Sequence, residues 1–168
     1  MPGPHELYLI RHGRAEERGD AWPDDAKRPL TPEGIALLRR SARGLARVSV
    51  GFDVVLTSPL VRARQTAETI AGELEARPSI VVVEALAPEG SVQAVVAELE
   101  KQAKRARIAL VGHEPSIGAL AARLAGIRQP LEFKKGAICR IDVDDLPPTA
   151  PGLLRWYVPP RFLRSLKR

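Results

Sequence analysis

Short apolar runs alternate with amphipathic helical patterns along this chain, and this alternation constrains the fold more than any other feature. The apolar runs predict strands over residues 7–10, 52–57, 80–83, 108–111, 137–143 and 153–158. The helical patterns predict helices that start after Thr31 and over 61–74, 92–99 and 116–125. Alternation of this kind places parallel strands between two layers of helices. We therefore predict an α/β fold: a three-layer α/β/α sandwich with a mostly parallel central sheet.

Three local signals add detail to this prediction. Thr31 followed by Pro32 is typical of a helix start, with a capping side chain and a proline at the first helical position. The β-branched run at 80–83 is typical of a strand covered on both faces. The segment 144–151, rich in Pro and Asp, is predicted to be the turn between the two last strands. Because no repeat or linker interrupts the pattern, we expect a single domain over residues 1–168.

The composition narrows the setting in which this chain works. No apolar run approaches the roughly 20 residues of a membrane-spanning helix, and the N-terminus lacks the basic and apolar regions of a signal peptide. The single cysteine, Cys139, cannot form an internal disulfide and is expected to be a small core residue. These features predict a cytoplasmic protein without a membrane partner.

The net charge of +6 favours an anionic partner, which could be nucleic acid, an acidic protein or a phosphate ester. The chain has two Tyr and three Phe, which are too few for a platform that stacks bases, so nucleic acid is disfavoured. Part of the charge lies in a C-terminal run that we expect to be a solvated tail: Arg161, Arg164, Lys167 and Arg168.

Residues suited to chemistry follow the predicted strands and do not precede them. In chain order they are Arg11-His12-Gly13, Ser58-Pro59-Leu60-Val61-Arg62, Glu84, and Gly112-His113-Glu114-Pro115. Parallel sheets bind ligands at the carboxyl ends of their strands. We therefore expect two imidazoles and two guanidiniums to surround one anion-sized hollow.

This set of residues favours phosphoryl transfer through a covalent histidine intermediate. Arg11 and Arg62 each offer a planar fork of donors that matches two phosphate oxygens. His12 would attack through one ring nitrogen while a backbone carbonyl holds the other, and the two guanidiniums would help to keep its ring neutral. His113 would add a donor to the phosphoryl oxygens, and Ser58 is included among the substrate-binding residues.

Glycines complete the predicted site, because Gly13 and Gly112 would let the backbone approach the ligand without a Cβ in the way. Each piece also has a structural reading. A lone histidine after a strand is more often structural than catalytic, and Arg62 could be a surface residue in the first turn of a helix. Taken together, and with their placement at strand ends, the residues favour the functional reading.

At these residues the chain resembles the histidine phosphatase superfamily, also called phosphoglycerate mutase-like. Its hallmark triplet corresponds to Arg11-His12-Gly13. The stretch Ser58-Pro59-Leu60-Val61-Arg62-Ala63-Arg64-Gln65-Thr66-Ala67 resembles the family's Ser-Pro-x-x-Arg-x-x-Gln-Thr-Ala signature, and Gly112-His113-Glu114-Pro115 resembles its second-histidine block. The resemblance implies that His12 is phosphorylated, and that Arg11, Arg62 and His113 complete the phosphate pocket.

Within the superfamily, the short chain is most similar to the SixA-type phosphohistidine phosphatases. The segments that carry this similarity are 28–34, 86–90, and Trp156 with Pro159. Larger members use a carboxylic acid to protonate the leaving oxygen, and here the nearby candidates are Glu84 and Glu89. A phosphohistidine can depart as neutral imidazole, so a pocket weak in general acid favours an N–P substrate.

We therefore predict a metal-independent phosphatase without a cofactor that acts on phosphohistidine in proteins and is a monomer. Three alternatives stay open: a phosphatase for small phosphate esters such as sugar or nucleotide phosphates, a non-catalytic phosphate-binding module, and a basic nucleic-acid binder. A zinc site at His12 and His113 is disfavoured, because two arginines nearby would repel a cation. Trp22 and the loop 14–30 could either cover the pocket or simply pack beside it.

Overall fold

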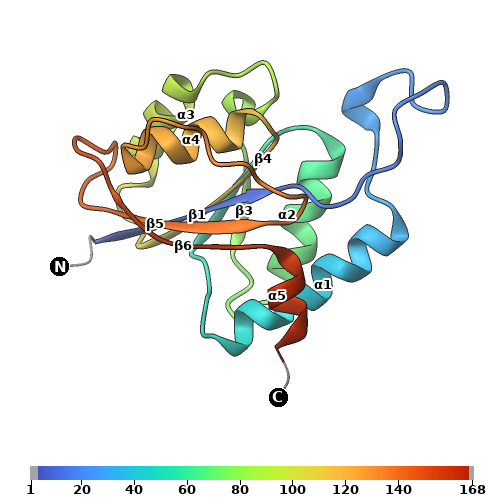
Figure 1. Cartoon of the computed structure of the whole chain (residues 1–168), viewed down its shortest axis with the longest axis horizontal. Helices are drawn as coiled ribbons and strands as arrows, with labels where there is room; N and C mark the ends of the chain where they lie inside the picture. The colour runs from blue at the N-terminus through green and yellow to red at the C-terminus, as the bar shows by residue number, and fades with distance from the viewer. Residues whose placement is uncertain (1–3, 167–168) are drawn as a thin grey trace.

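A computed structural model describes residues 4–166, and Figure 1 shows one sheet with helices on both of its faces. The strands are β1 (His5–Arg11), β2 (Val54–Thr57), β3 (Ser79–Val82), β4 (Arg107–Gly112), β5 (Ile138–Val143) and β6 (Leu153–Val158). The α-helices are α1 (Pro32–Arg47), α2 (Val61–Glu73), α3 (Val92–Leu99), α4 (Ser116–Ala125) and α5 (Pro160–Ser165). Three short 3-10 helices connect them: η1 (Asp25–Lys27), η2 (Glu84–Leu86) and η3 (Glu100–Gln102).

The order of the strands across the sheet is β3-β2-β4-β1-β5-β6. The pairs β3–β2, β2–β4 and β4–β1 are parallel, whereas β5 runs antiparallel to both of its neighbours. The sheet is therefore mostly parallel, and the predicted α/β sandwich is confirmed. Within it, β1 and β4 pair in a register that places Arg11 opposite Gly112. The next residues along the chain, His12 and His113, consequently leave the sheet side by side.

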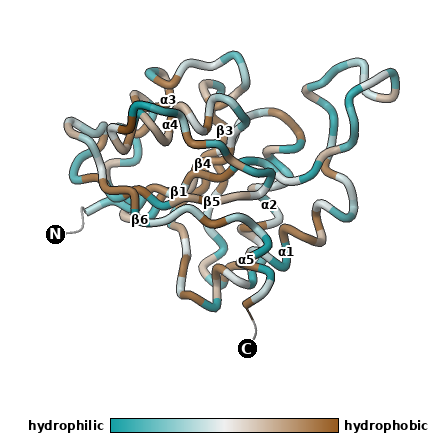
Figure 2. Tube along the Cα trace, viewed as in Figure 1, coloured by the Kyte–Doolittle hydropathy of each residue, from teal (hydrophilic) through white to brown (hydrophobic). Residues whose placement is uncertain are grey.

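The sheet has an apolar core on each face, because alternate side chains of a strand point to opposite sides. On β1, Leu7 and Leu9 pack with α3 and α4, while Tyr8 and Ile10 pack with α1, α2 and α5. Figure 2 shows hydrophobic stretches running along the central strands. Cys139 is fully buried in β5, as predicted, and burial raises the pKa of its thiol to about 12. Among residues 4–166, no helix is long and apolar enough to cross a membrane.

Helix α1 begins where the sequence predicts. The Thr31 side chain accepts a hydrogen bond from the Gly34 amide at 2.9 Å, and Pro32 occupies the first helical position. Leu38 and Leu45 lie on its buried face, against the sheet. These contacts fix α1 beside the carboxyl end of β1, where the predicted site lies.

Two expectations about the periphery of the fold are wrong. Strand β3 was expected to be covered on both faces, but it forms an edge of the sheet, and Ile80, Val81 and Val82 are 37%, 40% and 47% exposed. The position of a strand in a sheet depends on long-range pairing, which a run of β-branched residues does not reveal. The C-terminal run is not a solvated tail throughout. Arg161 and Arg164 lie on α5, which buries Leu163, whereas Lys167 and Arg168 lie outside the described residues.

The contact between α1 and α5 predicts opposite effects for two Gly→Ala substitutions in helices. A Cβ at Gly44 would clash with the Leu163 carbonyl oxygen, whereas a Cβ at Gly72 would meet nothing within 4 Å. We expect Gly44→Ala to lower the free energy of unfolding by roughly 1–3 kcal/mol through overpacking. Gly72→Ala should raise it by about 0.5–1 kcal/mol through helix propensity. Urea denaturation measures both, and equal effects would contradict the close packing of α5 on α1.

Candidate active site

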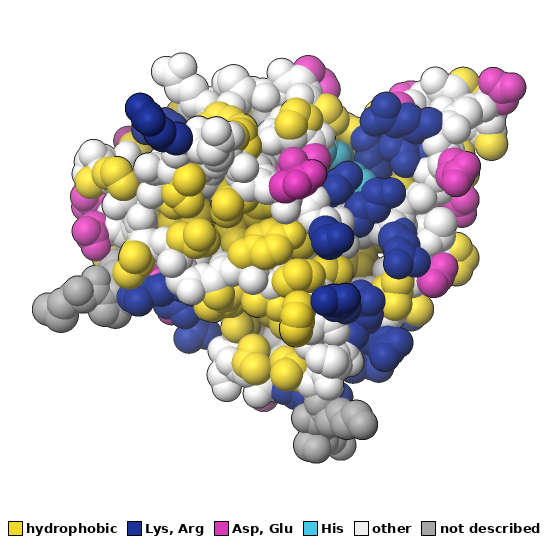
Figure 3. Space-filling view, viewed as in Figure 1, with side chains coloured by type: hydrophobic (Ala, Val, Ile, Leu, Met, Phe, Trp, Pro, Cys, Tyr) yellow, Lys and Arg dark blue, Asp and Glu magenta, His cyan; other side chains and the backbone are white. Residues whose placement is uncertain are grey.

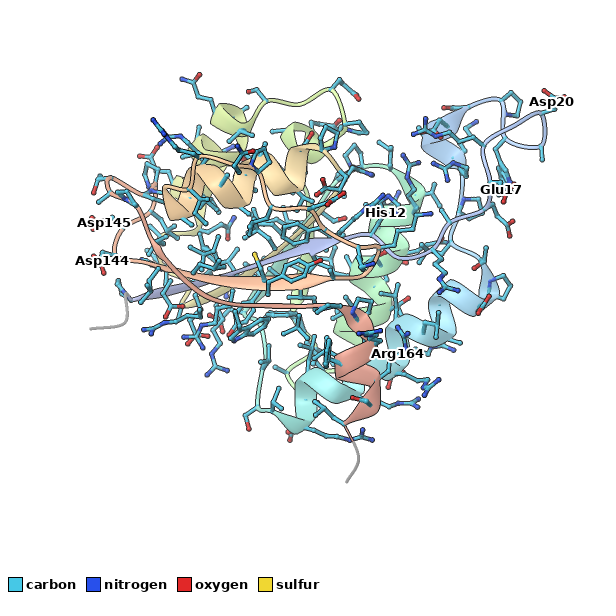
Figure 4. The ribbon with its side chains drawn as sticks, in the orientation of Figure 1. His12, Glu17, Asp20, Asp144, Asp145 and Arg164 are labelled. Carbon is cyan, nitrogen blue, oxygen red and sulfur yellow. The ribbon has the colours of Figure 1, made fainter. Side chains whose placement is uncertain are left out.

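His12 follows β1 directly, and its ring is held in one tautomer by the backbone. The side chain is 6% exposed, and its Nδ1 lies 2.7 Å from the Gly13 carbonyl oxygen. Because a carbonyl can only accept, Nδ1 carries the proton and Nε2 keeps its lone pair. Figure 4 shows His12 at the end of the sheet nearest the loop that carries Glu17 and Asp20. The tautomer is therefore the one in which Nε2 is a nucleophile.

His113 follows β4 and lies beside His12, with the ring centroids 5.1 Å apart. Its Nε2 is 2.7 Å from Ser58 Oγ, and that oxygen also accepts a hydrogen bond from the Leu60 amide at 3.2 Å. The Ser58 hydroxyl proton is satisfied when it is donated to Nε2 of His113. The proton of the neutral His113 ring then lies on Nδ1, which is buried and has no hydrogen-bond partner among residues 4–166. His113 thus has an unused donor.

The two arginines reach the site from different elements and have different partners. Arg11 ends β1, and its Nη1 donates to the Phe133 carbonyl at 2.8 Å. Arg62, in the first turn of α2, is 2% exposed, and it donates to the Asp25 carbonyl at 2.8 Å and to Asp25 Oδ2 at 3.0 Å. The other carboxylate oxygen of Asp25 accepts from Arg28 Nε at 2.9 Å. Asp25 therefore bridges two guanidiniums at the edge of the site.

A single pocket of about 510 Å³ is lined by Arg11, His12, Arg62 and His113, and we call it the histidine pocket. In Figure 3 the histidine side chains are visible at the bottom of a hollow rimmed by Lys and Arg. One wall comes from the loop between β1 and α1, which contributes Ala15, Glu16, Glu17, Arg18, Asp25 and Arg28. The remaining lining residues are Pro88, Glu114 and Lys135. The structure thus brings the four residues together around one hollow.

The other predicted site residues lie elsewhere. Ser58 is fully buried behind His113 and is not among the residues that line the histidine pocket. Gly13 lines a neighbouring cavity, and a Cβ there would lie 2.8 Å from Leu38 Cδ1, so close packing against α1 accounts for this glycine. Glu84 and Glu89 are exposed and do not line the pocket either.

Helix α2 ties the pieces of the site together through one of its faces. Three residues after Arg62, the Gln65 side chain accepts a hydrogen bond from the Leu30 amide at 2.7 Å. Thr66 accepts from the Gly13 amide at 3.1 Å and donates to the Arg62 carbonyl at 2.7 Å. Residues three and four positions apart share a helix face. The stretch from Arg62 to Thr66 therefore carries the guanidinium and also binds the end of the loop and the turn after His12.

Burial and positive charge together keep both imidazoles neutral. Burial is the largest cause of the low pKa of His12, about 3, and His113, Arg62 and Arg11 lower it further. Burial is also the largest cause of the low pKa of His113, about 4, and the charge of Arg62 is the next largest. The guanidiniums therefore act as the sequence predicts, but their effect is smaller than that of desolvation.

Asp25 and Arg28 line the histidine pocket, although neither was predicted to have a role there. They belong to the loop 14–30 and not to a strand end, so the rule that guided the other assignments does not apply to them. Burial acts to raise the pKa of Asp25, but hydrogen bonding to Arg28 and the charge of Arg62 lower it overall. Arg28 does belong to the segment 28–34 that resembles SixA-type proteins, and this resemblance is the signal in the sequence that points to it.

The loop 14–30 forms a side wall of the pocket, and Trp22 lines a separate hollow with Arg18, Gly19, Asp20, Pro23 and Asp25. Figure 4 places Asp20 at the outer tip of this loop, away from His12. Trp22 therefore packs beside the pocket and does not cover it. Within residues 4–166, no group of three or more His, Cys, Asp or Glu side chains is arranged to hold a metal ion.

Comparison with known proteins agrees with this geometry. Residues 7–87 match the model of the histidine phosphatase superfamily (branch 1). The phosphohistidine phosphatase SixA of Escherichia coli is 32% identical over 164 residues, which cover 96% of this chain and 98% of that protein. The chain belongs to the histidine phosphatase superfamily. It falls in the SixA branch and is a phosphatase.

Three further comparisons extend the similarity of this histidine phosphatase to other proteins. An uncharacterized protein of Picosynechococcus sp. is 43% identical over 122 residues, covering 71% of this chain and 73% of that one. The solved structure of the protein histidine phosphatase SixA complexed with tungstate superposes with a TM-score of 0.84 at 31% identity, covering 94% of this chain and 99% of that chain. The phosphoglycerate mutase of Bacillus anthracis, at 14% identity and a TM-score of 0.74, shares the fold.

The neutral buried imidazoles predict a loss of stability in acid. Between pH 6.5 and about 4 the unfolded chain binds protons on these rings while the folded chain does not, so the free energy of unfolding falls as the pH falls. Each ring contributes a slope of up to about 1.4 kcal/mol per pH unit. Urea denaturation at pH 7 and pH 5 measures the slope in the wild type and in His12→Ala. The variant should lose a smaller free energy over this range, and identical slopes would contradict a neutral buried His12.

Proposed function

We propose that this phosphatase hydrolyses phosphohistidine in proteins, through a covalent phosphoryl intermediate on His12. The observation that supports this most is the unengaged Nε2 of a neutral His12, in a pocket that it shares with Arg11, Arg62 and His113. The relative of known activity that covers nearly the whole chain is named a phosphohistidine phosphatase. A neutral imidazole with a fixed tautomer attacks phosphorus without a separate base.

In the first step, the Nε2 lone pair of His12 forms a bond to phosphorus while the N–P bond of the substrate breaks. The electron pair of that bond stays on the departing ring, which leaves as neutral imidazole when its other nitrogen is protonated. The developing charge on the phosphoryl oxygens is stabilised by Arg11, by Arg62 and by the unpartnered Nδ1–H of His113. Arg62 shares its donors between the phosphoryl group and Asp25.

In the second step, water attacks the phosphoryl group on His12 and orthophosphate is released. Nδ1 of His12 stays protonated throughout, because the Gly13 carbonyl holds that proton. The His12 ring therefore departs from phosphorus as a neutral imidazole and is at once ready for another turnover. A proton from the attacking water leaves with the phosphate or with solvent, and no metal is required in either step.

A general acid is needed less for an N–P bond than for an ester, since an alkoxide is a poor leaving group. The two acids expected from the sequence, Glu84 and Glu89, are exposed and outside the pocket lining. Glu16 and Glu17 do line the pocket, and this favours one second candidate function: hydrolysis of small phosphate esters, with one of them as the proton donor. Rates on phosphohistidine, sugar phosphates and nucleotide phosphates separate the two functions.

The central prediction concerns the nucleophile. His12→Ala should lower turnover of a phosphohistidine peptide on the order of 10³-fold or more, because no other group in the pocket forms the intermediate. His5→Ala, at the far end of β1, is the matched control and should retain wild-type turnover. Acid-labile radiolabel should appear on the wild type and the control and be absent from His12→Ala. Wild-type turnover by His12→Ala would overturn the assignment, and binding without turnover by the wild type would indicate a phosphate-binding module.

The acids are tested by single Glu→Gln substitutions. Glu84→Gln and Glu89→Gln should change kcat/KM for a phosphohistidine peptide less than about twofold, since surface positions outside the pocket contribute little. Glu16→Gln and Glu17→Gln should also change kcat/KM for the phosphohistidine peptide less than about twofold. They should lower the rate of hydrolysis of an alkyl phosphate. Comparable wild-type kcat/KM values for the alkyl phosphate and the peptide would count against an N–P substrate.

A further inference from the structure

A second cavity of about 530 Å³ lies next to the histidine pocket, between the end of β1, helix α1 and the start of α5. We call it the α1–α5 cavity. Arg11 and Lys135 line both hollows, so the two are neighbours on either side of these side chains. The phosphoryl chemistry proposed above uses the histidine pocket and leaves the α1–α5 cavity without a role.

The charged side chains that line the α1–α5 cavity are all positive. They are Arg11, Arg14, Lys134, Lys135, Arg161 and Arg164. Arg14 pairs with Glu33 at 3.3 Å, and both side chains are largely exposed, so this pair is weak. Among residues 4–166, Lys134, Lys135, Arg161 and Arg164 form no ion pair. Figure 3 shows this cationic surface running from the histidines toward the C-terminal end.

Crowding of like charges is visible at Arg164. Burial lowers the pKa of this guanidinium first, and the neighbouring charges of Arg40 and Arg14 lower it further. Cations held together without a counter-ion raise the free energy of the protein until an anion approaches. The side of α5 that faces the cavity is therefore suited to negative charge on a ligand.

The floor of the α1–α5 cavity adds apolar surface and an unused hydrogen-bonding group. Leu37, Pro159 and Pro160 provide apolar walls, and Ser41 lies on the same side of α1. Ser41 is 2% exposed, and its hydroxyl has no hydrogen-bond partner among the described residues. Such a buried group costs free energy unless a ligand or a water satisfies it. The cavity thus combines an apolar floor, a free hydroxyl and a cationic rim.

We propose that the α1–α5 cavity docks an acidic segment with an apolar side chain, on the phosphoprotein whose phosphohistidine enters the histidine pocket. The proposal rests on the function proposed above. The α1–α5 cavity lies beside the histidine pocket and not within it, so a ligand that reaches both must extend beyond the phosphohistidine itself. Its carboxylates meet Arg161 and Arg164 at the rim, and its apolar side chain meets Leu37 and Pro160.

The test compares two charge reversals of equal size. Arg161→Glu with Arg164→Glu alters the rim of the cavity, and Lys104→Glu with Arg105→Glu makes the same change before β4, at the opposite end of the sheet. The probes are a phosphohistidine peptide with flanking Glu and Leu residues, the same peptide with Gln in place of Glu, and free phosphohistidine. Circular dichroism and thermal unfolding establish that each variant is folded.

We expect the rim variant to raise KM for the acidic peptide about tenfold or more with kcat unchanged, and to leave free phosphohistidine turnover as in the wild type. The control variant should match the wild type on every probe. Equal wild-type KM values for the Glu and Gln peptides, or equal effects of both variants, would overturn the docking site. A loss of free phosphohistidine turnover in the rim variant would also overturn it, because the cavity would then serve catalysis.

Binding of the unphosphorylated acidic peptide, measured by calorimetry at 150 mM salt, separates this proposal from the proposed function. If the peptide binds through Arg161 and Arg164 but phosphohistidine is not hydrolysed, the proposed function is wrong and the docking site stands. If phosphohistidine is hydrolysed but the peptide does not bind through these arginines, the docking site is wrong and the proposed function stands. An RNA oligonucleotide of equal charge should bind more weakly than the peptide, and tighter RNA binding would identify the cavity as a polyanion site. Ser41→Ala should weaken peptide binding a few-fold, through loss of the one free hydroxyl.

Discussion

The parallel pairing of β1 with β4 is the interaction on which the site depends. Its register sets Arg11 opposite Gly112, and the His12 amide donates to the Gly112 carbonyl at 3.1 Å, which extends the ladder by one more bond. Both histidines are thereby delivered at the same height, with their rings 5.1 Å apart. A slip of one residue would turn one ring to the opposite face of the sheet. The buried residues of β1 and β4, fully enclosed in two cores, prevent that slip.

Helix α2 and the loop 14–30 supply the remaining residues of the site that β1 and β4 position. Arg62, Gln65 and Thr66 form hydrogen bonds to three different parts of the chain from one helix face. These bonds connect the Arg62 guanidinium, the end of the loop and the turn after His12 to the same helix. Burial then fixes the charge state of the rings, because a cation in this pocket loses hydration and meets two guanidiniums. The guanidiniums that would bind a phosphoryl anion thus add to the effect of burial, which is the larger cause of the neutral His12 ring.

Much of this arrangement could be predicted from the sequence, because it is encoded locally. Strand ends could be recognised from apolar runs and cap signals, and the rule for parallel sheets then placed Arg11, His12, Arg62 and His113 at one edge. Features that depend on distant contacts were missed. The edge position of β3 follows from the strand order, and the placement of Arg161 and Arg164 on α5 goes with the packing of α5 against α1. Asp25 reaches Arg62 across 37 residues of chain, and no periodicity records such a contact.

The carboxylate of Asp25 acts as an internal counter-ion for Arg28 and Arg62. Any phosphate that engages Arg62 must displace or share that carboxylate, so the free energy of an existing ion pair is subtracted from its affinity. The subtraction applies equally to an incoming phosphoryl group and to free orthophosphate. An equal subtraction raises the dissociation constants of both anions by the same factor. Free orthophosphate is therefore held less tightly than two guanidiniums without this carboxylate would hold it, which favours its release.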